Sequence, residues 1–254
     1  MKLEVLLSVM NLDKKDLDKM NITSKCIVIN QCGKNDYEKY KNFDIFSYDE
    51  IGTANSRNRG LEQISEDIIL LCDDDVVYER DYEKKVIEEF KNNENADMII
   101  FNVVNVFRNK RINKKSKRLH IYNSLNYAAY NVAFRRKSLG NIRMNTLFGP
   151  GSKYKSGGDD TLFIVDFLKN KLKIYSSNKT IGKITNDDST WFKGYNEKYF
   201  FDKGALFTAI NYRFRKILML QYLLRHKNVT KDIGFFNAYK NMKQGSKDYK
   251  NNNK

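Results

Sequence analysis

The sequence predicts an α/β fold in which a mixed, mostly parallel sheet is flanked by helices. Between residues 3 and 185, short apolar runs rich in β-branched residues alternate with stretches of helical pattern. The connections between most of these runs are about a dozen residues or longer, which is the length that parallel crossovers need. The chain has 254 residues, 41% of them hydrophobic, so it is long enough to bury a large core.

Most of the predicted strands are apolar on both faces, as buried parallel strands are. In chain order the predicted strands cover residues 3–10, 25–30, 43–48, 68–72, 96–107, 127–135, 174–176 and 180–185. The run at 43–48 alternates between apolar and polar residues, so we expect it at an edge of the sheet.

The helices are predicted from apolar stripes and from capping residues at their starts. They cover residues 14–20, 53–64 and 79–90, a segment that begins at 159, and residues 203–226 and 231–242. Residues 31–36, 108–118 and 144–158 are predicted to be loops, and the low-complexity residues 243–254 to be disordered.

Positive charge is concentrated in two parts of the chain. The net charge is +15, and residues 191–254 hold 14 Lys or Arg against 4 Asp or Glu. Residues 108–118 hold seven Lys or Arg and no acidic residue, whereas residues 1–107 have no basic excess. The basic regions are therefore additions to an ordinary domain, and they predict an anionic partner such as a membrane surface.

Composition also argues against several classes of protein. Cys26, Cys32 and Cys72 are too few and wrongly spaced for a zinc site, so we expect reduced, structural thiols in a cytoplasmic protein. No apolar run approaches the ~18–20 residues that a membrane span needs. The first residues carry a charge inside their apolar stretch and lack a small-residue cleavage site, so we interpret them as a strand and not as a signal peptide.

An acidic triplet, Asp73-Asp74-Asp75, follows the apolar run at 68–72 directly. Ligands of open α/β sheets bind at the carboxyl ends of strands, and adjacent like charges require solvent, raised pKa values or a cation. On extended backbone Asp73 and Asp75 point the same way, which suits Mn²⁺ or Mg²⁺. Taken alone, the triplet is equally compatible with a solvated acidic turn.

A second acidic pair, Asp159-Asp160, follows two glycines at the start of a predicted helix. A carboxylate there can accept the proton of an acceptor hydroxyl, and N-capping of the helix is the alternative. Arg57 lies between the third strand and the acidic strand. It is either a ligand of a nucleotide or a surface cation.

Three blocks, taken in this order, resemble the family 2 glycosyltransferases, which have the GT-A fold. The first, Gly52-Thr53-Ala54-Asn55-Ser56-Arg57-Asn58-Arg59-Gly60-Leu61, is similar to the family's alanine-arginine-asparagine-x-glycine segment. The second, Asp73-Asp74-Asp75, resembles its metal-binding Asp-x-Asp motif. The third, Gly158-Asp159-Asp160-Thr161-Leu162-Phe163, resembles its Glu-Asp motif. The resemblance covers about residues 3–185 and implies an inverting transfer of a sugar from a nucleotide donor to a hydroxyl.

The resemblance also implies roles for individual residues. Asp73 and Asp75 would hold Mn²⁺ or Mg²⁺, and Asp160 would be the base, with Asp159 as the alternative because it replaces the family's glutamate. The donor-binding candidates are Asn11, Asn30, Arg57, Asp73 and Asp74. The favoured donor is a UDP-sugar, and the acceptor is a glycan or a lipid-linked molecule of cell-surface polysaccharide synthesis.

Two departures from the family pattern concern the donor side. The second strand ends in Asn30-Gln31, where the family usually has an aspartate that binds the base. The family's late histidine has no counterpart, because the two histidines, His120 and His226, lie in a basic loop and in a C-terminal helix. Asp187 or Asp188 is the candidate to replace it as a metal ligand.

The chain is expected to divide into a GT-A catalytic domain at residues 1–190, a basic helical extension at 191–242 and the tail at 243–254. Residues 212–227 mix apolar and basic side chains, as helices in a membrane interface do, so we expect a protein peripheral to the inner face of the cell membrane. Packing of this helix on the catalytic domain is the alternative.

Two other classes of protein remain as competitors. A GT-A-like nucleotidyltransferase normally needs a glycine-rich loop after the first strand, and residues 10–14 contain no glycine. A nucleic-acid-binding protein would explain the charge, but its phosphate ligand would be repelled by the acidic clusters, so we expect no nucleic acid as a partner.

Overall fold

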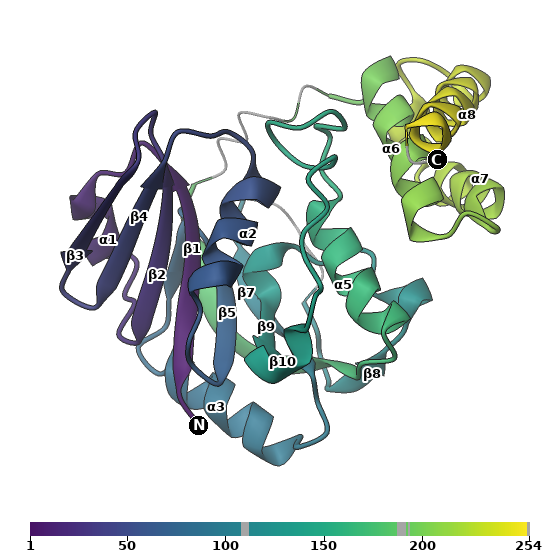
Figure 1. The fold of residues 1–254 in the computed structure, drawn as a ribbon. Coiled ribbons are helices and arrows are strands. Elements are labelled where there is room, and N and C mark those ends of the chain that lie inside the picture. The colour runs from purple at the N-terminus through teal and green to yellow at the C-terminus, as the bar shows by residue number, and fades with distance from the viewer. Residues whose placement is uncertain (108–111, 187–191, 193, 253–254) are drawn as a thin grey trace. The chain divides into compact units, whose positions relative to one another are not determined.

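The computed structural model describes residues 1–107, 112–186, 192 and 194–252, and it forms two compact units (Figure 1). The first unit comprises Met1–Met144 and Phe163–Asp188, and the second comprises Asn145–Leu162 and Ser189–Lys254. The second unit therefore takes in residues 145–162, which the sequence assigned to the catalytic domain. This segment packs against C-terminal helices, a long-range contact that no local pattern reveals.

The strands of the first unit lie in one sheet. They are β1 Leu3–Met10, β2 Lys25–Gln31, β3 Asp36–Tyr40, β4 Phe43–Tyr48, β5 Ile68–Asp73, β6 Val76–Tyr78, β7 Met98–Asn105, β8 Lys117–Leu119, β9 Val132–Arg135 and β10 Ile174–Ile184. Among the described residues their order is β3-β4-β2-β1-β5-β9-β7-β10-β6, and β8 pairs with β10. The neighbours β4, β2, β1 and β5 are parallel, as are β7 and β10, while β3, β6, β8 and β9 run antiparallel to their partners. The mixed sheet with a parallel centre agrees with the fold class that the sequence predicts.

Helices cover both faces of this sheet. They are α1 Lys14–Lys19, α2 Thr53–Gln63, α3 Tyr82–Asn92, α4 Arg136–Leu139 and α5 Asp159–Lys169, with 3₁₀ turns η1 Ile121–Asn123 and η2 Ala129–Asn131. Leu17 of α1 and Phe90 of α3 pack into the core on one face, and Leu61 of α2 and Phe167 of α5 pack into the core on the other. The alternation of side chains along each strand supplies both cores, which explains why the strands are apolar on both faces.

Four predicted strands of the first unit need correction. The strand at 43–48 is not the edge, because the polar strand β3 (Asp36–Tyr40) pairs outside it and is exposed along most of its length. The runs at 174–176 and 180–185 form one strand, β10, with an irregular register between Ser176 and Gly182. Only the last four residues of the run at 127–135 form a strand, β9, and residues 129–131 form the 3₁₀ turn η2. Tertiary pairing decided each of these cases, since the local pattern is weak there.

The second unit contains α6 Glu197–Ile210, α7 Arg215–Arg225, the 3₁₀ turn η3 Lys227–Thr230 and α8 Phe235–Asn251. The long helix predicted at 203–226 is wrong, because the chain leaves helical geometry at Asn211 and starts α7 four residues later. The tail predicted to be disordered is helical to Asn251. It is ordered by packing, since α8 touches α6 closely enough that a Cβ added at Gly245 would lie 1.8 Å from the carbonyl oxygen of Phe201.

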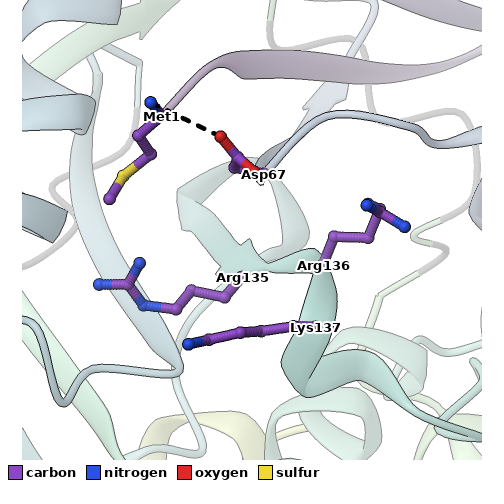
Figure 2. Close-up of a pocket in the computed structure, with 5 residues that line it drawn as sticks. All are labelled: Met1, Asp67, Arg135, Arg136 and Lys137. Carbon is purple, nitrogen blue, oxygen red and sulfur yellow. Dashed lines mark ion pairs between the residues drawn. The ribbon is translucent and has the colours of Figure 1, made fainter.

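A small cavity of about 260 Å³ opens at the amino-terminal edge of the sheet, beside the start of β5 (Figure 2). It is lined by Met1, Asp67, Arg135, Arg136 and Lys137. Two of its cations already bind main chain, because Arg135 donates hydrogen bonds to the carbonyls of residues 90, 94 and 96 and Arg136 donates one to that of residue 66. The cavity lies at the edge opposite to the end of β5 that carries Asp73, so it is not the candidate active site.

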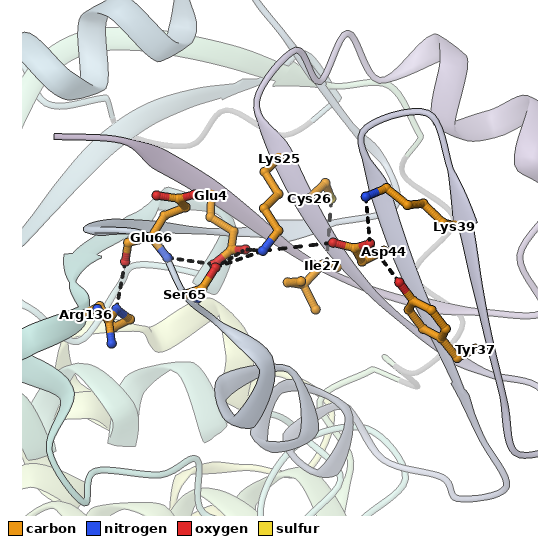
Figure 3. Close-up of polar contacts among 10 residues, drawn as sticks. All are labelled: Glu4, Lys25, Cys26, Ile27, Tyr37, Lys39, Asp44, Ser65, Glu66 and Arg136. Atoms are coloured by element: carbon orange, nitrogen blue, oxygen red, sulfur yellow. Dashed lines mark hydrogen bonds and ion pairs between the residues drawn. The ribbon is translucent and has the colours of Figure 1, made fainter.

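The same edge contains a fully buried carboxylate, Glu4 of β1 (Figure 3). It accepts hydrogen bonds from the backbone N–H groups of Ser65 and Glu66 at 2.7 and 3.3 Å, and it pairs with the Lys25 ammonium group at 2.8 Å. These contacts fix the entry into β5 against β1 and β2. A buried charge is tolerated here because all of these donors point at it.

Two sequence-based expectations can be checked directly. Within the described residues, no helix is long and apolar enough to cross a membrane. All three cysteines are free thiols, and burial raises the pKa of both Cys26 and Cys72 well above its ordinary value. Thiols with such a pKa are inert core residues at neutral pH.

Candidate active site at the carboxyl edge of the sheet

The parallel strands β2, β1 and β5 end at the same edge of the sheet. The register pairs Ser8 of β1 with Asp73 of β5, and Val9 of β1 with Asn30 of β2. The acidic triplet therefore lies one strand away from β1 and two from β2. This edge is where open α/β sheets bind ligands.

Arg57 reaches the acidic triplet from α2. Its Nη2 atom lies 2.6 Å from Oδ1 of Asp73, and its side chain is only 3% exposed. The neighbouring Ser56 of α2 makes a 2.6 Å hydroxyl contact with Ser8 of β1, which holds the start of the helix over the strand ends. Burial therefore excludes the surface-cation interpretation of Arg57 and places this arginine in the acidic cluster, while its role as a nucleotide ligand stays a prediction.

The other two carboxylates occupy the tight turn from β5 to β6. The carbonyl oxygen of Asp75 accepts hydrogen bonds from the N–H and the hydroxyl of Thr185 at 2.9 and 3.0 Å, which joins the turn to the segment after β10. The pKa of Asp74 is raised, first because surrounding protein desolvates its carboxylate and then because Asp73 carries a like charge. An environment that already disfavours negative charge on Asp74 would favour a cation nearby.

The side chain of Asn30 forms hydrogen bonds within the protein. Its side chain accepts a hydrogen bond from Leu12 N–H at 3.0 Å and donates one to the Ser47 hydroxyl at 3.3 Å, so it ties the loop after β1 to β2 and β4. Gln31 likewise donates to the carbonyls of residues 50 and 52, just before α2. Asn11 is exposed and adopts a left-handed backbone with φ of 51°, next to the end of β1. Of the two asparagines, Asn11 is thus the better placed to meet a ligand.

Asp159 and Asp160 form the first turn of α5, in the part of this helix that belongs to the second unit. The chain enters the helix through Gly158, whose φ of 117° is unfavourable for any residue with a Cβ. A side chain on Gly149 would meet the carboxylate of Asp159 at 2.7 Å, so this glycine leaves room for it. Asp159 is buried and Asp160 is partly exposed, which makes Asp160 the more accessible of the two carboxylates.

The loop that leads to this pair is fastened to the C-terminal helices. Asp202 of α6 accepts hydrogen bonds from the N–H and the hydroxyl of Ser156 at 3.1 and 2.7 Å. Asp248 of α8 accepts one from the buried Tyr154 hydroxyl at 2.7 Å and pairs with Lys153 at 2.8 Å. Sequence reasoning missed both acids. The available signal was their rarity, since residues 191–254 contain only 4 acidic residues among 14 basic ones.

Asp73 and Asp75 suit a hard divalent cation, because both are carboxylates that are only partly exposed at a strand end. In the described part of the chain, no group of three or more His, Cys, Asp or Glu side chains is placed to hold a metal ion. Asp187 and Asp188, the candidate additional ligands, lie outside the described residues. The two carboxylates that are described, Asp73 and Asp75, fit a metal such as Mg²⁺, which usually binds through one or two carboxylates together with water and phosphate oxygens.

Residues 28–150 match the model of the family described as glycosyl transferase family 2. The match includes Arg57 and the acidic triplet and ends before Asp159. A search of curated proteins found no match.

Several solved structures share the fold of this chain. TarS 1–349 of S. aureus in complex with UDP-GlcNAc has a TM-score of 0.64 and 15% identity, over 92% of this chain and 75% of that one. The same protein in complex with UDP has a TM-score of 0.62 at 15% identity, over 92% and 74%. The mannosyltransferase PcManGT of Pyrobaculum calidifontis, in complex with GDP-Man and Mn²⁺, has a TM-score of 0.56 and 10% identity, over 100% and 76%. These likenesses establish the GT-A fold.

Proposed function

Residues 28–150 of this glycosyltransferase are a family 2 domain on a GT-A fold, and we propose that the enzyme inverts the sugar that it transfers. The donor is a nucleotide-diphosphate sugar, with a UDP-sugar favoured, and the acceptor is a hydroxyl group of a glycan or of a lipid-linked molecule. The observation that carries this proposal is the ion pair between buried Arg57 and Asp73 at the carboxyl edge of β5. It lies within the residues that match the family.

The donor binds at the ends of β1, β2 and β5. Arg57 binds one carboxylate oxygen of Asp73, which restricts the orientations open to this carboxylate. Asp74 and Asn11 lie at the same edge and are available to the sugar and the nucleoside. Asn30 contributes by shaping the loop after β1 through its bond to Leu12, and not as a direct ligand of the base.

Asp73 and Asp75 hold Mn²⁺ or Mg²⁺ when the metal is bound. A metal held by these two carboxylates would supply neutralisation of the charge on the diphosphate, which would make the diphosphate a better leaving group. Desolvation, and after it the like charge of Asp73, raises the pKa of Asp74, and a cation bound nearby would relieve the second of these effects.

The second carboxylate pair serves the acceptor. Asp160 takes the proton of the acceptor hydroxyl while the oxygen attacks the anomeric carbon on the side opposite to the departing diphosphate, which inverts that carbon. Asp160 is the preferred base because it is the more accessible carboxylate, whereas Asp159 is buried under Gly149. Such a base typically contributes ~10²–10⁴-fold to the rate.

The acceptor places the enzyme in cell-surface polysaccharide synthesis. We propose that the enzyme works in the cytoplasm, peripheral to the inner face of the membrane, where a lipid-linked acceptor would be exposed. The net charge of +15 supports attraction to an anionic surface.

The test is a thermal-shift screen of nucleotide sugars with and without Mn²⁺, followed by product analysis with the donor that binds. We expect a metal-dependent stabilisation, release of a nucleoside diphosphate, and a product whose anomeric configuration is opposite to that of the donor. Asp75→Asn should abolish the metal dependence, whereas Asp49→Asn, a substitution of an exposed carboxylate before α2, should retain it. Release of inorganic diphosphate would instead identify a nucleotidyltransferase.

A further inference from the structure

Helix α7 has two apolar faces, and only one of them is buried within the protein. Met219 and Leu223 are almost fully buried. Ile217, Leu220 and Leu224 are 61%, 39% and 61% exposed. Their spacing of three and four residues places them along one side of the helix. Phe214, three residues before Ile217 and 49% exposed, extends the same line. We call these four residues the α7 stripe.

Cations border the α7 stripe on both sides. Lys216 precedes Ile217 by one residue and Arg225 follows Leu224 by one, so Lys216 lies about 100° around the helix from Ile217, and Arg225 lies about 100° from Leu224 in the opposite direction. Arg213 and Lys227 extend the charge beyond both helix ends. The stretch from 203 to 231 contains no Asp or Glu, so no acidic neighbour in sequence neutralises these cations.

We propose that the α7 stripe and its bordering cations are a docking surface for an anionic lipid bilayer. An exposed apolar line flanked by Lys and Arg matches a helix that lies in the plane of the membrane interface, with its apolar side chains among the acyl chains and its cations at the phosphates. A protein partner would need acidic groups on both sides of an apolar ridge, whereas an anionic bilayer offers both components everywhere. The helix has only 11 residues, which suits lying on a bilayer and is too short to span one.

This inference rests on the proposed membrane location and names the residues that would make the contact. It does not require sugar transfer, because vesicle binding needs neither donor nor acceptor. The two proposals can therefore fail separately.

The experiment measures co-sedimentation of the full chain with vesicles of phosphatidylcholine alone or mixed with phosphatidylglycerol. We expect binding only to the mixed vesicles, weakened by added salt. The variant Ile217→Ser/Leu220→Ser/Leu224→Ser should lower the partition coefficient at least about tenfold, because each side chain loses apolar area that the bilayer would bury. Its melting temperature should stay at the wild-type value, since the three residues are exposed.

The matched control is Ile51→Ser, since Ile51 is 66% exposed but lies in the first unit. It should bind mixed vesicles like the wild type. Absence of wild-type binding to mixed vesicles, or equal losses in the triple variant and in the control, would overturn the proposal. A wild-type dimer that the triple variant dissociates, with no vesicle binding, would overturn it in favour of contact between two copies of the chain.

Discussion

Replacing Asp202 by asparagine should reduce sugar transfer while leaving donor binding intact. Asp202 is 1% exposed, and its Oδ2 atom accepts both hydrogen bonds from Ser156, while its Oδ1 atom pairs with Lys198. Asparagine keeps one acceptor and adds an N–H₂ group, which must face either the Ser156 N–H or the Lys198 ammonium group. One or two charge-assisted hydrogen bonds are lost, and each is worth about 1.5–3 kcal/mol. We therefore expect the loop before Asp159 to be destabilised by about 2–3 kcal/mol.

If this destabilisation of the loop raises the activation free energy by the same amount, because the base Asp160 is less well positioned, kcat/KM for transfer should drop by about 30- to 150-fold. A difference of 1.36 kcal/mol corresponds to a factor of ten in rate. The assay compares transfer kinetics with donor affinity measured by calorimetry, below the melting temperature of the variant. Donor affinity should be unchanged, because the donor-binding candidates all lie in the first unit. Asp232→Asn, which changes an exposed acid of the second unit, is the matched control and should alter neither quantity. Equal losses of donor affinity and transfer, or no loss of either, would refute the positioning role.

Three further outcomes follow from individual contacts. Arg57→Lys should weaken donor binding about tenfold in calorimetry, because the ammonium group of a lysine cannot reproduce the buried guanidinium contact with Asp73. An unchanged donor affinity would show that Arg57 is not part of the donor site. Glu4→Gln should lower the free energy of unfolding in urea by about 2–4 kcal/mol, because the amide has no charge and only one acceptor oxygen, so it cannot accept from both Ser65 and Lys25; a loss below ~1 kcal/mol would contradict this. Burial lowers the pKa of Lys203 from 10.5 to about 8. Between pH 8 and pH 10.5 the unfolded chain therefore binds a proton that the folded chain does not. The charged Lys203 lowers the free energy of unfolding by its full amount below pH 8, and this loss of stability decreases as the pH rises. Lys203→Met should thus raise the melting temperature at pH 7, and the gain should shrink toward pH 10.5; a constant gain would contradict the shift.

The sequence predicted the sheet edge that holds the candidate donor site. Apolar runs with β-branched residues are buried on both sides of a sheet, and their alternation is local, so β1, β2, β4 and β5 could be located within a few residues. Because these strands are parallel, their carboxyl ends had to meet, which predicted that the acidic triplet and the end of β2 lie at one edge. The strand register agrees with that prediction, because it pairs Ser8 of β1 with Asp73 of β5 and Val9 of β1 with Asn30 of β2.

Local sequence patterns did not predict the elements whose structure depends on long-range packing. The polar strand β3 has no apolar signal of its own and exists because β4 offers it an edge. The tail at 243–254 has the composition of a disordered segment, yet α8 continues to Asn251, because Gly245 and Ser246 are buried in the contact with α6. Conversely, nothing in the apolar pattern at 203–226 marks the end of α6 at Ile210.

The surroundings of Asp159 and Asp160, the candidate residues on the acceptor side, depend on the tertiary structure. The sequence identified Asp159 and Asp160 and placed them in a catalytic domain, with the C-terminal helices as an appendage. The structure instead fastens their loop to those helices through Asp202 and Asp248, which lie 46 and 94 residues further along the chain than the residues they bind. Hydrogen bonds across such separations leave no periodicity in the sequence, whereas the apolar repeat of a strand does. For this reason the sequence alone predicts the donor-binding edge of the sheet, and only the folded chain reveals which helices hold the candidate base.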